Sequence, residues 1–202
     1  MKNAVMFNSP QKQCIRINKG TTLTEVIMYM VIAAIVMGAV YTMSKGAFSA
    51  SDTSKEINAY NDMMAKTPRY LKNQGQYNYT GAAQMTGTYI VMNGGAPVGL
   101  NLVGTASSGS ASLTNTYGGA VTLAPATSSG GQKSGFTLTT EGIPQETCTN
   151  IVTTLSSSSN VATTKVNGTS TAGPVRSSTA VQQCKADTGS TGNNTLVFTS
   201  LS

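Results

Sequence analysis

The chain has 202 residues, which is enough for one modest domain and one membrane helix. It contains no histidine, and its 7 carboxylates show no spacing typical of an acid–base pair, so the Ser-His-Asp and Cys-His classes of catalysis are excluded. The formal net charge is +6, but four of the basic residues, Lys2, Lys12, Arg16 and Lys19, lie within residues 1–20, which contain no acid. The rest of the chain has nine basic and seven acidic residues, a net charge of +2. This charge is too weak to indicate nucleic-acid binding.

An uncharged apolar stretch, 26–43, follows this basic segment. As a helix it would extend roughly 27 Å, close to the thickness of the hydrocarbon core of a bilayer. Gly20 and Thr21 precede it, and the carboxylate of Glu25 lies at its edge, where a charge is costly unless it is paired. An ordinary secretory signal has a shorter apolar core and its small-residue site after that core. A plain signal anchor explains the length but neither Gly20 nor Glu25.

The order of basic leader, Gly20, Thr21, Glu25 as the fifth residue after Gly20, and apolar helix resembles the class III signal of type IV prepilins and pseudopilins. The resemblance implies that a prepilin peptidase cuts between Gly20 and Thr21 and methylates the new N-terminus, although Thr21 departs from the apolar residue common there. It also implies that Glu25 pairs with the N-terminus of a neighbouring subunit and sets the register of assembly. The long leader, 1–20, resembles the type IVb subgroup, and Cys14 within it is interpreted as a thiol lost on processing.

Residues 21–43 are therefore expected to form a transmembrane and polymerisation helix, and 44–73 its periplasmic continuation. Gly38 and Gly46 are candidates for loosening of this helix when a subunit moves from membrane to filament, although an ordinary glycine of a membrane span is an equally good interpretation. Pro68 predicts a kink or an early end. Near-helical spacing places Ile57, Tyr60, Met64, Tyr70 and Leu71 on the buried face, and Asp52, Lys55, Glu56, Lys66 and Lys72 on other faces.

Residues 74–202 are expected to form a β-rich head. The segment 75–119 predicts mainly loop, with a short strand at 88–92. Turn and strand patterns predict further strands at 120–123, 135–140 and 195–201. Together with the resemblance, these elements predict an α+β type IV pilin fold, in which a long N-terminal helix packs on an antiparallel or mixed C-terminal β-sheet.

Cys148 and Cys184 are the cysteines that remain after removal of the leader. In a domain exported to an oxidising compartment, two cysteines most simply form a disulfide, and closing a loop of this length stabilises a fold by roughly 3–4 kcal/mol. The chain has no CxxC motif and no histidine, so metal and thioredoxin-like sites lack ligands, and we expect no metal and no cofactor.

The run from the turn at 115–119 through Phe136 to Cys148 also resembles bundle-forming, colonisation and conjugative thin-pilus pilins of the type IVb subgroup. The resemblance implies a major pilin that passes from the inner membrane, with its N-terminus cytoplasmic and its head periplasmic, into an extracellular filament for conjugation or adhesion. The implied partners are further copies of the chain, minor pilins, the prepilin peptidase, the inner-membrane platform protein and the assembly ATPase. The alternatives are a minor pilin, a type II secretion pseudopilin and, from another class, a membrane-anchored binding domain that never polymerises.

Overall fold

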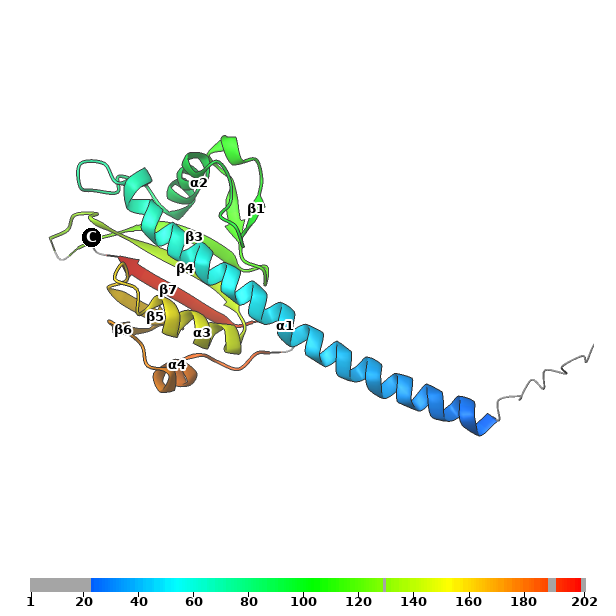
Figure 1. Ribbon diagram of the computed structural model, residues 1–202. Coiled ribbons are helices and arrows are strands. Elements are labelled where there is room, and N and C mark those ends of the chain that lie inside the picture. Colours follow the sequence, from blue (N-terminus) through cyan, green and yellow to red (C-terminus); the bar gives the residue numbers. More distant parts are fainter. Residues whose placement is uncertain (1–22, 129, 189–191, 201–202) are drawn as a thin grey trace, which may run out of the picture. The chain divides into compact units, whose positions relative to one another are not determined.

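Figure 1 shows the computed structural model, which describes residues 23–128, 130–188 and 192–200. The chain divides into two units, Met1–Ser44 and Lys45–Ser202. Helix α1, Leu23–Leu71, is continuous over 49 residues and belongs to both units. The second unit, called the head below, also contains every strand.

Helix α1 ends in the head at Leu71, three residues after Pro68, so the proline lies within the last turn, where it disrupts few helical bonds. The carbonyl of Leu71, which has no helical partner, accepts a hydrogen bond from the hydroxyl of Tyr79 at 3.3 Å. Gln74 has a positive φ of 48°, as does Gly75 at 81°, and these two residues reverse the chain.

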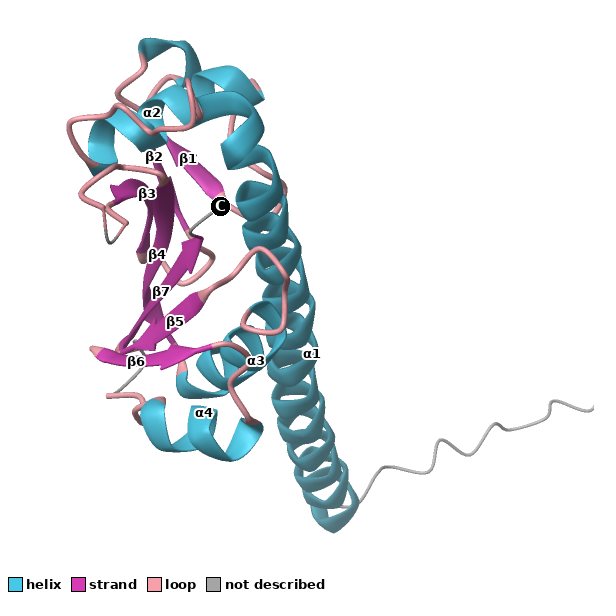
Figure 2. Ribbon diagram, turned by 90° about the vertical axis from the view of Figure 1, so that its left-hand side faces the viewer, coloured by secondary structure: helices cyan, strands magenta, loops and turns pink. Residues whose placement is uncertain are grey.

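One antiparallel seven-stranded sheet, in the order β1-β2-β3-β4-β7-β5-β6, forms the centre of the head. The prediction of an α+β fold is confirmed. In the head, Figure 2 shows α1 and α3 on the same face of this sheet. Its strands are β1 (Asn101–Val103), β2 (Ser112–Thr114), β3 (Ala120–Ala126), β4 (Gly135–Ile143), β5 (Thr163–Val166), β6 (Thr169–Ala172) and β7 (Asn194–Ser200). The three strands predicted after residue 119 correspond to β3, β4 and β7.

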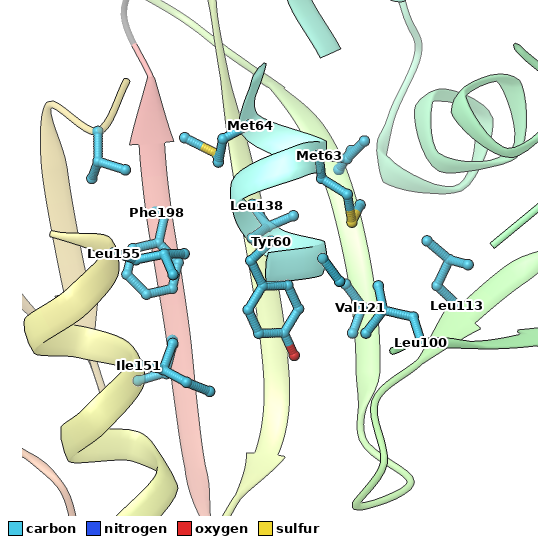
Figure 3. Packing of buried hydrophobic residues seen from close by; sticks show 14 of the residues in the cluster. Tyr60, Met63, Met64, Leu100, Leu113, Val121, Leu138, Ile151, Leu155 and Phe198 are labelled. Carbon is cyan, nitrogen blue, oxygen red and sulfur yellow. The ribbon is translucent and has the colours of Figure 1, made fainter. Parts of the chain in front are cut away.

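The core lies between the sheet and the part of α1 in the head (Figure 3). Alternate residues of the central strands face α1, because side chains of a strand alternate between its two faces. From α1, Tyr60, Met63 and Met64 meet them and are buried, whereas Ile57 and Tyr70 are only partly buried. The buried side chains of the central strands are Val121, Leu123, Phe136, Leu138, Leu196 and Phe198.

The prediction for 75–119 is wrong in its details. Residues 88–92 are not a strand but part of helix α2, Ala82–Asn93, and β1, a 3₁₀ turn at Ala106–Ser108 and β2 follow it. The β-branched and aromatic residues of 88–92 suggested a strand, but burial of Met85, Tyr89 and Ile90 on one face favours a helix, since tertiary packing overrides local propensity. Gly94, with φ 76°, caps the end of this helix.

Four further elements between β4 and β7 were not predicted: α3 (Gln145–Leu155), β5, β6 and α4 (Ser177–Gln183). Asn167 and Gly168 both have positive φ, at 48° and 93°, and join β5 to β6 as a two-residue hairpin. An Asn-Gly pair between two short β-type runs is a strong hairpin signal, so this hairpin was readable from the sequence.

Candidate functional site

The residues expected to be processed lie at the start of the chain. Gly20 and Thr21 lie outside the described residues, and so does the side chain of Glu25, whose backbone lies in the first turn of α1. Cleavage, methylation and the register role therefore stay predictions. The structure has α-helix at Gly38 and Gly46, and the loosening expected there on assembly also stays a prediction.

The first part of α1 presents a run of apolar side chains. In the part of the chain that the structure describes, no helix meets the length and hydropathy of a membrane span. The side chains of 32–50, within which most of the expected span falls, lie outside that part. The described apolar side chains near the start of α1 are 40–71% exposed: Val26, Ile27, Met28, Met30 and Val31.

Glu56 joins α1 to the sheet through a buried carboxylate. One of its oxygens accepts hydrogen bonds from the backbone N–H of Thr116, at 2.7 Å, and from the Thr116 hydroxyl, while the other accepts one from the Tyr60 hydroxyl at 3.2 Å. The hydroxyls of Tyr60 and Thr140 are 3.0 Å apart. The expectation that Glu56 lies on a face of α1 other than the buried one is wrong: it is fully buried, four residues before Tyr60 and on the same face of the helix.

Burial controls the protonation of this pair. Burial raises the pKa of Glu56 above its ordinary value, and the hydrogen bonds from Thr116 and Tyr60 offset part of that rise. Burial, together with the nearby Glu56, raises the pKa of Tyr60 as well, so this hydroxyl remains protonated and can donate. The arrangement is therefore a fixed acceptor site for groups of the chain itself.

Asn115 organises the turn that receives α1. Its side-chain carbonyl accepts hydrogen bonds from the N–H groups of Tyr117 and Gly119, at 3.1 and 2.8 Å. Its amide donates to the Thr140 hydroxyl at 3.1 Å and to the carbonyl of Glu141 at 2.7 Å. We call Glu56, Tyr60, Asn115, Thr116 and Thr140 the clamp. The turn at 115–119, singled out from the sequence, thus holds the head's part of α1.

The second candidate region is the C-terminal part of the head. A disulfide joins Cys148 of α3 to Cys184, which follows α4, with their Cα atoms 6.0 Å apart. These are the two cysteines that the sequence paired. Both are buried, so the bond links the two helices from inside the fold.

Asn194, at the start of β7, ties together the segments around the disulfide. Its amide donates to the carbonyls of Ile143 and Lys185 at 2.9 and 3.0 Å. Its carbonyl accepts from the N–H of Lys185 at 2.7 Å and from the Asn167 amide at 2.8 Å. This fully buried residue was missed in the sequence, because an asparagine in an Asn-rich segment reads as a loop residue.

An open hollow of about 360 Å³ lies on the surface formed by α3 and α4. Next to it, a carboxylate oxygen of Asp187 accepts a hydrogen bond from the backbone N–H of Gln145 at 2.9 Å and so caps α3 from a distant segment. In the described residues no group of histidine, cysteine and acidic side chains could hold a metal ion. The lining residues of the hollow are Gln145, Glu146, Thr149, Asn150 and Val181.

A long N-terminal helix whose final part packs on one face of an antiparallel sheet, beside a disulfide-linked C-terminal region, defines the class of type IV pilins. Residues 49–201 match the family model described as PilS N terminal. A comparison with curated protein sequences gave no match.

Two solved structures make the assignment more specific. The crystal structure of the type IVb pilin from Salmonella typhi is 37% identical, with a TM-score of 0.62, over 72% of this chain and 97% of that one. The NMR structure of the type IVb pilin (PilS) from Salmonella typhi is also 37% identical, with a TM-score of 0.50, over 73% of this chain and 95% of that one. The chain therefore belongs to the PilS family of type IVb pilins, which are structural subunits and not enzymes. Membership implies self-assembly into an extracellular pilus.

Proposed function

We propose that this chain is the major pilin of a type IVb pilus and polymerises through α1 into a filament that serves conjugation or adhesion. The observation that supports this most directly is the group of exposed apolar side chains Val26, Ile27, Met28, Met30 and Val31. Contiguous exposed apolar surface marks a membrane or protein contact, and in a filament the same helix of neighbouring copies supplies that contact.

The proposed route starts in the inner membrane. The basic residues of 1–20 hold the N-terminus on the cytoplasmic side by the positive-inside bias, and the peptidase cuts between Gly20 and Thr21. The platform protein and the assembly ATPase then transfer α1 from lipid into a helical bundle. A contact repeated by one screw operation gives an open filament rather than a closed ring. In that bundle Glu25 pairs with the N-terminus of a neighbour and sets the register.

The structure of the head supports such a transfer. Within the head, α1 is held by buried apolar side chains, among them Met63 and Met64, and by the clamp around Glu56. Burial of each such apolar side chain is worth about 1.5–3 kcal/mol, so the helix and the sheet move as one body when the helix is pulled.

The experiment that tests the proposal is N-terminal sequencing and intact mass of the protein sheared from the cell surface. We expect an abundant chain that begins at N-methyl-Thr21 and is lighter by two hydrogens for one disulfide. A chain that starts at Met1 and stays in the inner membrane would identify an anchored domain and contradict the proposal. A processed chain that is scarce in the sheared polymer would identify a minor pilin, and one confined to the periplasm a pseudopilin.

The register role of Glu25 is tested by Glu25→Ala in the full chain, with Asp52→Ala as control, since Asp52 is a partly exposed carboxylate of the head whose ion pair with Lys55 lies at the surface. We expect Glu25→Ala to be cleaved normally but to form far fewer pili, since the neighbour's N-terminus then lacks its partner. Sheared pilin relative to total pilin measures this. Normal pili from Glu25→Ala would exclude the role.

A further inference from the structure

The head has charges of opposite sign at its two ends. We call Arg69, Lys72 and Lys133 the basic end; they surround the point where α1 stops and β4 begins. We call Glu141, Glu146 and Asp187 the acidic end, which lies where β4 stops and α3 begins. Lys72 is partly exposed and the other five are exposed.

Contacts with Tyr77 bring Lys133 near Lys72, which lies three residues after Arg69 in the chain. The backbone N–H of Tyr77 donates to the carbonyl of Lys133 at 2.8 Å, and the ammonium of Lys72 lies 5.9 Å from the centre of the Tyr77 ring. Asp62, the acid that precedes them along α1, is already paired with Lys66 at 2.8 Å. Within the described residues, Arg69 and Lys72 at this end of the helix thus have no carboxylate as ion-pair partner.

Two observations define the acidic end. Asp187 caps the first residue of α3 at 2.9 Å, and the next residue, Glu146, lines the hollow of about 360 Å³ as its only charged side chain among the described residues. One cation, the exposed Lys185, is close to Asp187 in the chain. The hollow itself therefore presents one carboxylate together with amide, hydroxyl and apolar groups. These groups suit the methylene chain and the charged end group of a lysine or arginine side chain.

The two ends are too far apart to pair within one subunit. Strand β4 separates them, and its nine residues extend roughly 30 Å at about 3.3 Å per residue. A second copy displaced along the strand, in contrast, brings its basic end to the acidic end of the first. Such a contact uses two different patches, so it repeats without closing, as a filament requires.

We propose that in the assembled pilus the basic end of one head contacts the acidic end of a second copy, with Arg69 or Lys72 entering the hollow beside Glu146. This inference rests on the proposed function, because it assumes that the heads assemble. It adds a head-to-head contact to the packing of α1, and complementary charges at such a contact select the register and orientation of the partner.

Charge reversal and exchange in the full chain test the proposal, in cells that have the complete assembly machinery. Glu146→Lys alone, and Arg69→Glu with Lys72→Glu, should each lower sheared pilin relative to total pilin by roughly tenfold, because like charges then face each other. Combining all three substitutions exchanges the two ends and should restore assembly to near the unmodified level. The matched control is Lys165→Glu, an exposed lysine in the middle of β5 that should have no effect.

Total pilin and the disulfide between Cys148 and Cys184 report whether each variant folds. If the variant with Arg69→Glu and Lys72→Glu fails to accumulate, Lys133→Glu, in the loop before β4, takes its place and is combined with Glu146→Lys. If the combined variant assembles no better than its worse parent, the proposed contact is wrong, although the pilin assignment stands. If the unmodified chain gives no sheared polymer, the proposed function itself fails.

Discussion

The elements at the two edges of the sheet are held to its central strands in different ways. On one side, α2, β1 and β2 pack beside β3, and we call this the α2 side. On the other, α3, α4, β5 and β6 surround β7, and we call this the disulfide side. Among the described residues, only the disulfide side has a covalent link between elements, so the α2 side depends on the fit of its side chains.

The α2 side depends on one hydroxyl and one glycine. The Thr86 hydroxyl accepts from the N–H of Leu123 at 2.9 Å and donates to its carbonyl at 3.3 Å, so a helix side chain satisfies the edge of β3. Beside it, a Cβ on Gly87 would lie 1.9 Å from the carbonyl oxygen of Gly109, so no other residue fits. The disulfide side instead combines a buried S–S bond with the four hydrogen bonds of Asn194.

The largest effect should come from removing that link. For Cys148→Ser with Cys184→Ser we expect a loss of about 4 kcal/mol in the free energy of unfolding, because the unfolded chain is released from a closed loop. Denaturant unfolding of the purified chain measures it, and hydrogen exchange should show early loss of protection in α3 and α4. We also expect less pilin in the periplasm. Unchanged stability would mean that both sides are held by packing alone.

A smaller effect should follow from Thr86→Val, which keeps the shape of the side chain but leaves the N–H and carbonyl of Leu123 unpaired. We expect a loss of about 1–3 kcal/mol, with increased hydrogen exchange along β3 and none in α3. Thr86→Ser, which keeps the hydroxyl, is the control and should retain most of the stability. Equal losses in both variants would show that the methyl group, and not the hydroxyl, holds the α2 side.

The smallest effect concerns the clamp between the two sides. The pKa of Glu56 is raised in the folded state, so the folded protein binds the proton more tightly than the unfolded chain does. The contribution of protonated Glu56 to the stability of the fold is therefore complete below the ordinary pKa of 4.5. It is lost as the pH rises through the raised pKa of the folded state.

Glu56→Gln removes this dependence and keeps an acceptor for Thr116. We expect the unmodified protein to lose stability relative to Glu56→Gln as the pH rises from 4.5 towards neutral, because deprotonation of Glu56 then costs more free energy in the folded protein than in the unfolded chain. Thermal unfolding of both proteins across this range measures the difference. A constant difference would show that Glu56 titrates alike in the folded and unfolded states.

Local sequence patterns were sufficient to predict an element where the turn residues and the spacing of the buried residues indicated the same secondary structure. Strands β3, β4 and β7 were found because turn glycines bound alternating apolar residues, as with Leu196 and Phe198. Helix α3 has apolar residues at helical spacing, with Cys148, Ile151 and Leu155 buried, and could have been found in the same way. The strand predicted at 88–92 failed, because β-branched side chains there pack as well on a helix when one face is covered.

The sequence by itself determined the long N-terminal helix, the α+β class, the resemblance to type IVb pilins and the pair of cysteines, since each depends on residue order, length or a short motif. Only the tertiary structure decided the order of the seven strands, the burial of Glu56, the roles of Thr86 and Asn194, and the separation of charge between the two ends of the head. The physical reason is that a polar side chain is stable inside a protein only when distant segments supply its partners, and one-dimensional spacing does not contain those partners.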